Sequence, residues 1–267
     1  MELIKKQIHM NQWKGNVTTQ ITLDDDFIVP DTLDDMEQVM LDTGEIQIET
    51  VKNQGDKVAV KGKLEFQVLY RKESGGLQTL GGNIPFEEVV NVQGLEEKDY
   101  VGLNWMLEDL NTDMINSRKL GVQAIITLQV RVETLRDVEA AVDVDMENNS
   151  RPAGAGMSDT DGAGQVQVET LKRTANAAAI AVRRKDTYRI KEELSLTGGK
   201  PNIGQLLWRE MKLRDVTAKP LDGRLHLDGE LSVFVIYGAE DENMPVQWLE
   251  ETIPFSGDME MGDVKED

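Results

Sequence analysis

The segment Val58–Gly76, VAVKGKLEFQVLYRKESGG, decides the fold, because it recurs 167 residues later as Leu225–Asn243, LHLDGELSVFVIYGAEDEN. Five of the nineteen aligned positions are identical: a glycine, a leucine, a valine, a tyrosine and a glutamate. In both segments apolar residues recur at every second position, which places them on one face of a β-strand. Gly62 and Gly229 interrupt this row at the same point, as a glycine does at a bulge or a close backbone approach.

The correspondence extends well beyond this strand. Asp35–Leu41 (DMEQVML) corresponds to Asn202–Trp208 (NIGQLLW). After two extra residues in the second loop, the tripeptide IPF at 84–86 returns at 253–255. A repeat of this length is too long for a solenoid and indicates duplication of a whole domain.

We therefore predict three parts of the chain. Residues 1–147 form a first β domain, residues 148–164 form a flexible linker rich in Gly, Ala, Ser and Asp, and residues 165–267 form a second β domain. Nothing in the second copy matches residues 100–132, which carry a further strand pattern in the first copy. We expect the second domain to be truncated at its C-terminal end or completed by strands of another chain, because an unpaired sheet edge invites pairing.

The expected fold class is mainly β, with two tandem β-sandwich-like domains that each contain one short helix. In the first copy we place this helix at Asp34–Leu41, with Met36, Val39 and Met40 on one side and an aspartate at its N-terminal cap. We expect Leu171–Arg184 to be extended, in agreement with its partner in the first copy.

Composition excludes several functions. The net charge of −20 disfavours nucleic acid and anionic membranes as partners, and the absence of cysteine excludes disulfides and thiolate zinc sites. The N-terminus lacks the apolar core of a signal peptide, and no stretch approaches 18 apolar residues, so we predict no membrane insertion and a reducing cytoplasm.

No catalytic, cofactor-binding or metal-binding residues are predicted. The two histidines, His9 and His226, are far apart, and we expect both to face solvent without a nucleophile beside them. The acidic turns Asp24–Asp26 and Asp31–Asp35 offer carboxylates but lack the ligand spacing of a calcium loop. We interpret them as a solvated turn and a helix cap.

The aromatic residues leave two alternatives open. We expect Trp208 to fill the core and Trp13, Trp105 and Trp248 to be buried or half-buried, whereas an exposed set would suit sugar stacking. For the repeated tyrosines, Tyr70 and Tyr237, we expect the hydroxyl to reach a backbone group at the edge of the core.

The order DMEQVMLDTGEI, KVAVKGKLEFQVLY, a glycine turn and IPFEEVV resembles the SPOCS domain of clostridial spore-coat proteins of the SipL type. The resemblance covers the first copy and the first hundred residues of the second copy, and no segment of the chain resembles the LysM module that follows the domain in some members. It implies a structural domain without catalytic residues or cofactors. It also implies other spore-coat proteins as partners, among them a SpoIVA-like coat ATPase, and self-assembly.

Our hypothesis from the sequence is a non-enzymatic structural or assembly protein of the spore coat or exosporium that acts through protein–protein interaction. It would be made in the mother-cell cytoplasm and then deposited on the spore surface. Strand addition at sheet edges and two linked modules would both favour assembly. The main alternative is a glycan- or peptidoglycan-binding β module, and a weaker one is a metal-dependent hydrolase that uses the acidic turns.

Overall fold

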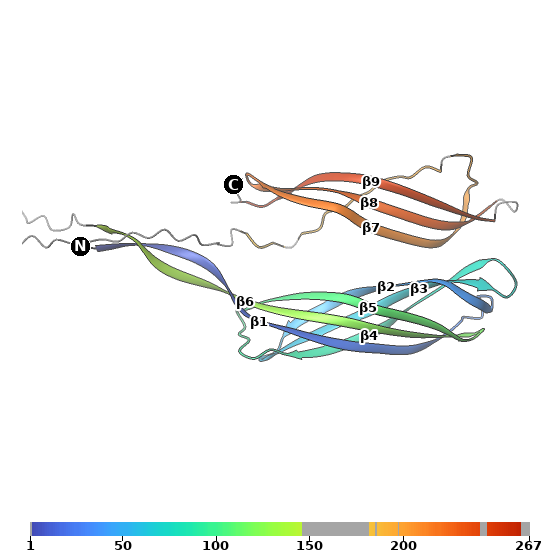
Figure 1. The fold of residues 1–267 in the computed structure, drawn as a ribbon, viewed down its shortest axis with the longest axis horizontal. Coiled ribbons are helices and arrows are strands. Elements are labelled where there is room, and N and C mark those ends of the chain that lie inside the picture. The colour runs from blue at the N-terminus through green and yellow to red at the C-terminus, as the bar shows by residue number, and fades with distance from the viewer. Residues whose placement is uncertain (1, 146–181, 185, 197, 241–244, 263–267) are drawn as a thin grey trace, which may run out of the picture. The chain divides into compact units, whose positions relative to one another are not determined.

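The computed structural model describes residues 2–145, 182–184, 186–196, 198–240 and 245–262. The predicted linker at 148–164 and most of Leu171–Arg184 lie outside these residues. The described part of the chain contains nine β-strands and no helix (Figure 1). It accordingly has no helix long and apolar enough to cross a membrane. The strands are β1 Glu2–Ile28, β2 Met36–Asn53, β3 Lys57–Lys72, β4 Leu77–Asn91, β5 Tyr100–Asn116, β6 Lys119–Asp145, β7 Ile203–Leu221, β8 Arg224–Ala239 and β9 Val246–Glu260.

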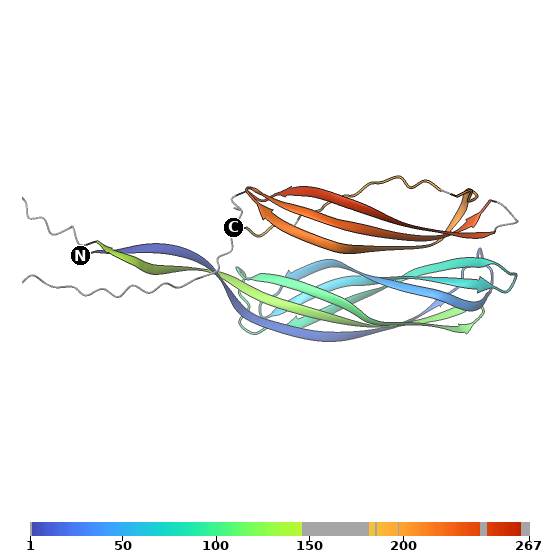
Figure 2. The same ribbon diagram turned by 45° about the horizontal axis from the view of Figure 1, so that its top comes forward.

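Residues 13–133 fold into a β-sandwich, which we call the N-terminal sandwich. One sheet has the strand order β2-β3-β4 and the other has the order β1-β6-β5, and the two sheets lie in separate layers (Figure 2). Their facing side chains form one hydrophobic core. The alternate apolar residues of β6 from Leu120 to Val132 are at most 2% exposed. β6 is the middle strand of its sheet, and these side chains pack in the centre of the core.

The outer parts of β1 and β6 form a separate unit. Within the described residues, 2–12 group with 134–145, and β1 and β6 are neighbours in their sheet. Lys5 pairs with Glu139 at 2.9 Å, and His9 bonds Asp137 across the same ribbon. Both pairs are exposed to solvent, so we assign them little stability.

Strands β7, β8 and β9 form a third sheet, which we call the C-terminal sheet. Every residue pair between β2 and β3, apart from the pair at Gly62, recurs between β7 and β8 at a distance of 167 residues. The β3–β4 pairs recur between β8 and β9 with the two-residue insertion. The repeat predicted from the sequence is therefore confirmed at the level of strand register.

The predicted helix at Asp34–Leu41 is wrong, because most of these residues belong to β2. Regular pairing of β2 is interrupted between Met36 and Gln38 and between Val39 and Leu41. Each interruption inserts one residue, so apolar side chains on the same face lie three positions apart instead of two. A spacing of three also fits a helix, which explains the error. The same two interruptions occur in β7, where the second predicted helix is wrong for the same reason.

Gly62 is required where the ring of Phe86 crosses β3. A Cβ atom built at Gly62 would lie 2.7 Å from Cζ of Phe86 and 2.6 Å from the carbonyl oxygen of Gln47. At Gly229 a Cβ atom would likewise lie 2.6 Å from Cζ of Phe255. The phenylalanine ring thus covers a glycine at the same place in both copies, as predicted for a close approach.

We expect Gly62→Ala to destabilise the N-terminal sandwich by about 1–3 kcal/mol, since the added methyl group meets backbone as well as ring atoms. Urea unfolding of the full chain, followed by the exchange protection of β3 amides, measures this loss. Gly55→Ala does not serve as a control, because Gly55 has a positive φ of 61°. Gly15→Ala does, because nothing lies within 4 Å of a Cβ atom there. A Gly62→Ala protein as stable as Gly15→Ala would contradict the packing.

Each of the repeated tyrosines forms a hydrogen bond to the backbone just before the first strand of its three-stranded sheet. The hydroxyl group of Tyr70 donates to the carbonyl oxygen of Asp34 at 3.0 Å, and that of Tyr237 donates to the carbonyl oxygen of Pro201 at 3.2 Å. Asp34 and Pro201 occupy equivalent positions, so the hydrogen bond is part of the repeat. Both rings are fully buried, and burial raises the pKa of Tyr70 above its ordinary value.

Candidate interaction surface

We call one face of the C-terminal sheet its inner face. The equivalent face of the N-terminal sandwich, on β2, β3 and β4, packs against the second sheet of that sandwich. The inner face is made of three residues from each strand: Arg209, Met211 and Leu213 from β7, Leu231, Val233 and Val235 from β8, and Leu249, Glu251 and Ile253 from β9. The counterparts are Asp42, Gly44, Ile46, Leu64, Phe66, Val68, Leu80, Gly82 and Ile84.

In the N-terminal sandwich this face is covered. Leu64 and Val68 are fully buried, and Ile46 is 7% exposed. In this cover β5 lies over β2, β6 over β3 and β1 over β4. The evidence is that Leu107 of β5 lies close to Gly44 of β2 and that Phe27 of β1 lies close to Gly82 of β4. Ordinary sheet-on-sheet packing thus removes the apolar face from water.

In the C-terminal sheet the edge of the same face is open. Leu213, the equivalent of Ile46, is 63% exposed, and Met211 is 59% exposed. Leu231 is partly exposed, whereas its equivalent Leu64 is fully buried. Among the residues that the structure describes, the sheet of β7, β8 and β9 has no further hydrogen-bonded strand. The face is therefore open along β7, at Met211 and Leu213, whereas Val233 of β8 and Leu249 of β9 are 8% and 7% exposed.

One flank of the inner face is occupied by the chain itself. The hydroxyl group of Tyr188 donates to the carbonyl oxygen of Ser256 at 2.9 Å, and its ring lies 5.9 Å from that of Phe255. Tyr188 corresponds to Ile21 of β1, which packs on the core of the N-terminal sandwich. The segment around Tyr188 therefore takes the place of β1 beside β9, although it forms no regular strand.

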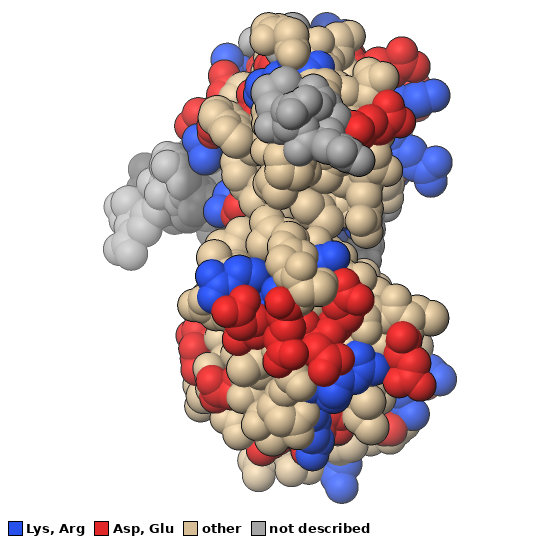
Figure 3. Space-filling model, turned by 90° about the vertical axis from the view of Figure 1, so that its right-hand side faces the viewer, with Lys and Arg blue, Asp and Glu red and all other residues tan. Residues whose placement is uncertain are grey.

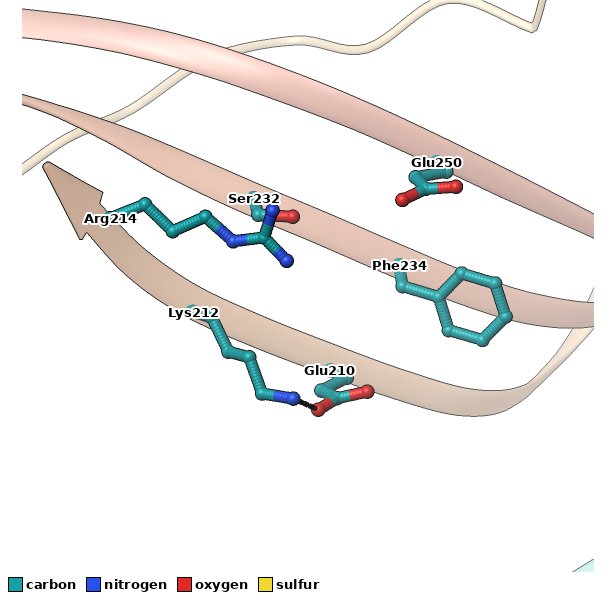
Figure 4. Close-up of a pocket in the computed structure, with 6 residues that line it drawn as sticks. All are labelled: Glu210, Lys212, Arg214, Ser232, Phe234 and Glu250. Atoms are coloured by element: carbon teal, nitrogen blue, oxygen red, sulfur yellow. Dashed lines mark ion pairs between the residues drawn. The ribbon is translucent and has the colours of Figure 1, made fainter.

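The opposite, outer face of the C-terminal sheet carries a shallow hollow of about 300 Å³. It is lined by Glu210, Lys212, Arg214, Ser232, Phe234 and Glu250, with an ion pair between Lys212 and Glu210 (Figure 4). Two cations and two carboxylates surround one aromatic ring, so the hollow has no strong preference for a ligand of either sign.

An aromatic pair lies on the outer face. The rings of Phe234 and Trp248 are 6.4 Å apart, and the amine of Lys200 lies 4.6 Å from the ring centre of Trp248. Trp248 is 55% exposed, and a tilted pair of this kind offers an apolar surface against which a flat ligand can stack.

The burial predicted for three tryptophans is wrong, while that of Trp208 is confirmed at 5% exposure. Trp13, Trp105 and Trp248 are 54%, 46% and 55% exposed. They lie on β1, β5 and β9, each of which is the edge strand of its sheet and is flanked on one side only. Edge position alone does not decide exposure, because Trp208 lies on β7, which is also an edge strand, and is buried.

His226 lies between two carboxylates on β8 and β9. Its Nδ1 atom is 2.6 Å from Oδ1 of Asp258, and its Nε2 atom is 3.2 Å from Oδ2 of Asp228. The hydrogen bond to Asp258 and the charges of both aspartates raise the pKa of His226 above its ordinary value. The same bond holds the pKa of Asp258 below its usual range.

The neighbourhood of His226 also contains a serine that the sequence analysis missed. Oγ of Ser256 lies 3.5 Å from Nε2 of His226, so serine, histidine and aspartate are aligned as in a hydrolase triad. The nearer partner of Nε2 is Asp228, however, and two carboxylates favour the imidazolium form. An imidazolium cannot accept the serine proton, so this arrangement does not activate Ser256.

We expect the pKa of His226, measured by NMR titration of the full chain, to lie above 6.5, and Asp258→Asn to lower it more than Asp228→Asn does. Because the folded-state pKa is raised above the ordinary value of 6.5, the stabilising contribution of this pair is complete below pH 6.5 and is lost as the pH rises through the higher folded-state pKa. A pKa of His226 at or below 6.5 would contradict the geometry.

The acidic turns are neutralised by the protein's own cations. Asp26 pairs with Lys119 at 2.6 Å, and Asp34 pairs with Lys72 at 3.0 Å and accepts a hydrogen bond from Ser74. These bonds hold the pKa of Asp34 below its usual value, with the Lys72 bond as the main cause.

Arg118, in the turn between β5 and β6, binds the second acidic turn. Its guanidinium group donates to the carbonyl oxygens of Val29 and Leu33 and pairs with Asp31 and Asp35, all at 2.9–3.0 Å. The predicted helix-capping role of the aspartates is therefore wrong, because they anchor a loop to this arginine.

On the face drawn in Figure 3, a group of acidic side chains lies beside Lys and Arg side chains. In the described residues no group of three histidine or carboxylate side chains is arranged to hold a metal ion.

The described strands form a duplicated β module, whose two copies share their strand register. The family model described as "SipL, SPOCS domain" matches residues 35–115 and 202–267, which together make up more than half of the chain. The chain belongs to the SipL SPOCS domain family, and this membership relates it to sporulation. No curated protein and no solved structure matches it significantly. The two family matches begin at equivalent positions and include β2–β4 and β7–β9.

Proposed function

We propose that the protein is a non-enzymatic assembly protein of the spore coat or exosporium, made in the mother cell and recruited to the spore surface by protein–protein contacts. The observation that carries this proposal is the open inner face of the C-terminal sheet. Leu213 and Met211 are exposed there, although the equivalent face of the N-terminal sandwich is a core. An exposed apolar surface of this kind marks an interaction site.

The family membership supports sporulation as the process, and the side chains support a binding role. Membership in the SipL SPOCS domain family favours sporulation as the process. Other coat proteins, among them a SpoIVA-like coat ATPase, and further copies of the chain are the partners that the proposal includes. Among the described residues, Ser256 lies beside His226, which is held between Asp228 and Asp258, and this arrangement favours a binding role over hydrolysis.

A fluorescent fusion of the full chain in sporulating cells tests this proposal. We expect the signal to move from the mother cell to the spore surface and to stay diffuse when Leu213→Asp and Leu231→Asp place charges on the inner face. Met114→Asp, on β5 of the N-terminal sandwich, is the matched control, because Met114 is also exposed, at 41%. A fusion that remains diffuse throughout sporulation would refute the proposed role.

The pair of Phe234 and Trp248 favours glycan or peptidoglycan binding as a second candidate. In that case the chain would sediment with purified peptidoglycan, and Trp248→Ala would abolish sedimentation. Trp105→Ala is the comparison, since Trp105 is similarly exposed but has no aromatic partner among the described ring pairs. Binding that survives Trp248→Ala would remove this candidate.

A further inference from the structure

The chain segment that leads into the C-terminal sheet contacts the N-terminal sandwich through Arg183. The guanidinium carbon of Arg183 lies 4.0 Å from the ring centre of Tyr100, and the same group pairs with the carboxylate of Glu133. Tyr100 of β5 and Glu133 of β6 are cross-strand partners, so the register of the sheet holds ring and carboxylate side by side. Val132 is 1% exposed and faces the core, so Glu133 lies on the outer face of the sandwich.

Tyr100 and Glu133 together form a site that suits the side chain of an arginine. A planar guanidinium group can stack on an aromatic ring and pair with a carboxylate at the same time, whereas the compact amine of lysine is less suited to both. The side chains of Arg183 and Glu133 are 32% and 19% exposed, so both charges are partly shielded from water. Shielding strengthens the ion pair relative to a fully exposed one.

The next residue, Arg184, contacts the other module. Its guanidinium group donates to the carbonyl oxygen of Glu260, the last residue of β9, at 3.1 Å, and it pairs with Asp186 at 3.1 Å. Glu133, Arg183, Arg184 and Glu260 all belong to one compact unit of the chain. Two consecutive arginines therefore hold the two modules, Arg183 the N-terminal sandwich and Arg184 the C-terminal sheet.

The place of these contacts along the chain gives them a mechanical consequence. Glu133 is the last residue of the sandwich, and β6 continues from Thr134 into the separate ribbon unit. The chain thus leaves the sandwich after Glu133 and meets it again at Arg183. Residues 134–182, which include the predicted linker at 148–164, begin and end at the same point. The length of such an excursion does not determine how far apart its two ends lie.

We propose that Arg183 and Arg184 act as a clasp that sets the spacing of the two modules independently of the length of the linker. With the clasp closed, the dipeptide is the connection between the modules. With the clasp open, only the chain of residues 134–182 joins them, and the reach of the C-terminal module increases. The clasp therefore regulates the effective concentration of one module beside the other. This inference goes beyond the proposed role in the spore coat and does not depend on it.

Single-molecule energy transfer on the full chain tests the clasp. The chain has no cysteine, so Gly15→Cys on β1 and Lys219→Cys on β7 provide one dye position in each module. We expect a narrow distance distribution that does not change when about twenty Gly and Ser residues are inserted into 148–164. Arg183→Ala should raise the fraction of open molecules about tenfold, and the same insertion should then lengthen the mean distance.

Arg189→Ala is the matched control, because it removes an exposed arginine from the same segment and touches neither contact. It should leave the distribution unchanged, whereas Tyr100→Leu with Glu133→Gln should reproduce the effect of Arg183→Ala from the other side of the contact. Two results would overturn the inference: an insertion that lengthens the distance in the otherwise unaltered chain, or an Arg183→Ala protein with the distribution of Arg189→Ala. Either result would leave the proposed function standing, because that function is tested by localisation.

Discussion

Ile46→Ala should destabilise the N-terminal sandwich by about 2–5 kcal/mol, whereas Leu213→Ala at the equivalent position should change the stability of the C-terminal sheet by no more than about 0.5 kcal/mol. Ile46 is 7% exposed and lies opposite Leu64 on β3; Leu213 is 63% exposed and lies opposite Leu231 on β8. The first substitution leaves a cavity between two sheets, and the second removes atoms that already contact water.

Hydrogen exchange of the full chain measures both effects in the same sample. Amides of β3 report on the N-terminal sandwich, and amides of β8 report on the C-terminal sheet. Equal losses of protection for the two variants would mean that the inner face of the C-terminal sheet is covered in solution.

Arg118→Met should destabilise the N-terminal sandwich by more than about 2 kcal/mol. The guanidinium group of Arg118 donates to two carbonyl oxygens, those of Val29 and Leu33, and pairs with Asp31 and Asp35. Methionine retains the apolar stem but leaves these acceptors without their donor. The loop between β1 and β2 then loses its guanidinium contacts with the turn between β5 and β6 and keeps the backbone hydrogen bonds from Val29 to Arg118 and from Met36 to Ser117.

Arg118→Lys separates charge from geometry. A lysine amine is a single point charge and cannot reach four acceptors in a planar array, so we expect it to restore only a small part of the stability. Urea unfolding of the full chain provides the comparison. Full restoration by lysine would show that net charge, and not the array of hydrogen bonds, holds the loop.

The strand register was the part of the fold most accessible from the sequence. The recurrence of Gly62, Leu64 and Tyr70 at a fixed distance predicted two equivalent strands, and their neighbours pair in the same way in both copies. This worked because alternation and turn length together determine which residues face each other. The helix failed because the interruptions in β2 imitate a helical spacing, and only the pairing partner distinguishes the two.

The expectation that the C-terminal sheet lacks counterparts of residues 100–132 stays a prediction. The difference in surroundings between Met211 and its equivalent Gly44 was not predictable from the sequence, because Gly44 contacts Leu107 and Leu110 of β5. Such contacts join distant parts of the chain and leave no periodic signal in either strand.

The most direct test of the account is the solvent exposure of equivalent methyl groups in the full chain. Isoleucine and leucine methyls are labelled for NMR, and a soluble paramagnetic agent is added. We predict strong broadening for Leu213 and partial broadening for Leu231, with little effect on Ile46 and Leu64. Equal protection of all four residues would contradict the claim that one copy of the module is closed and the other is open.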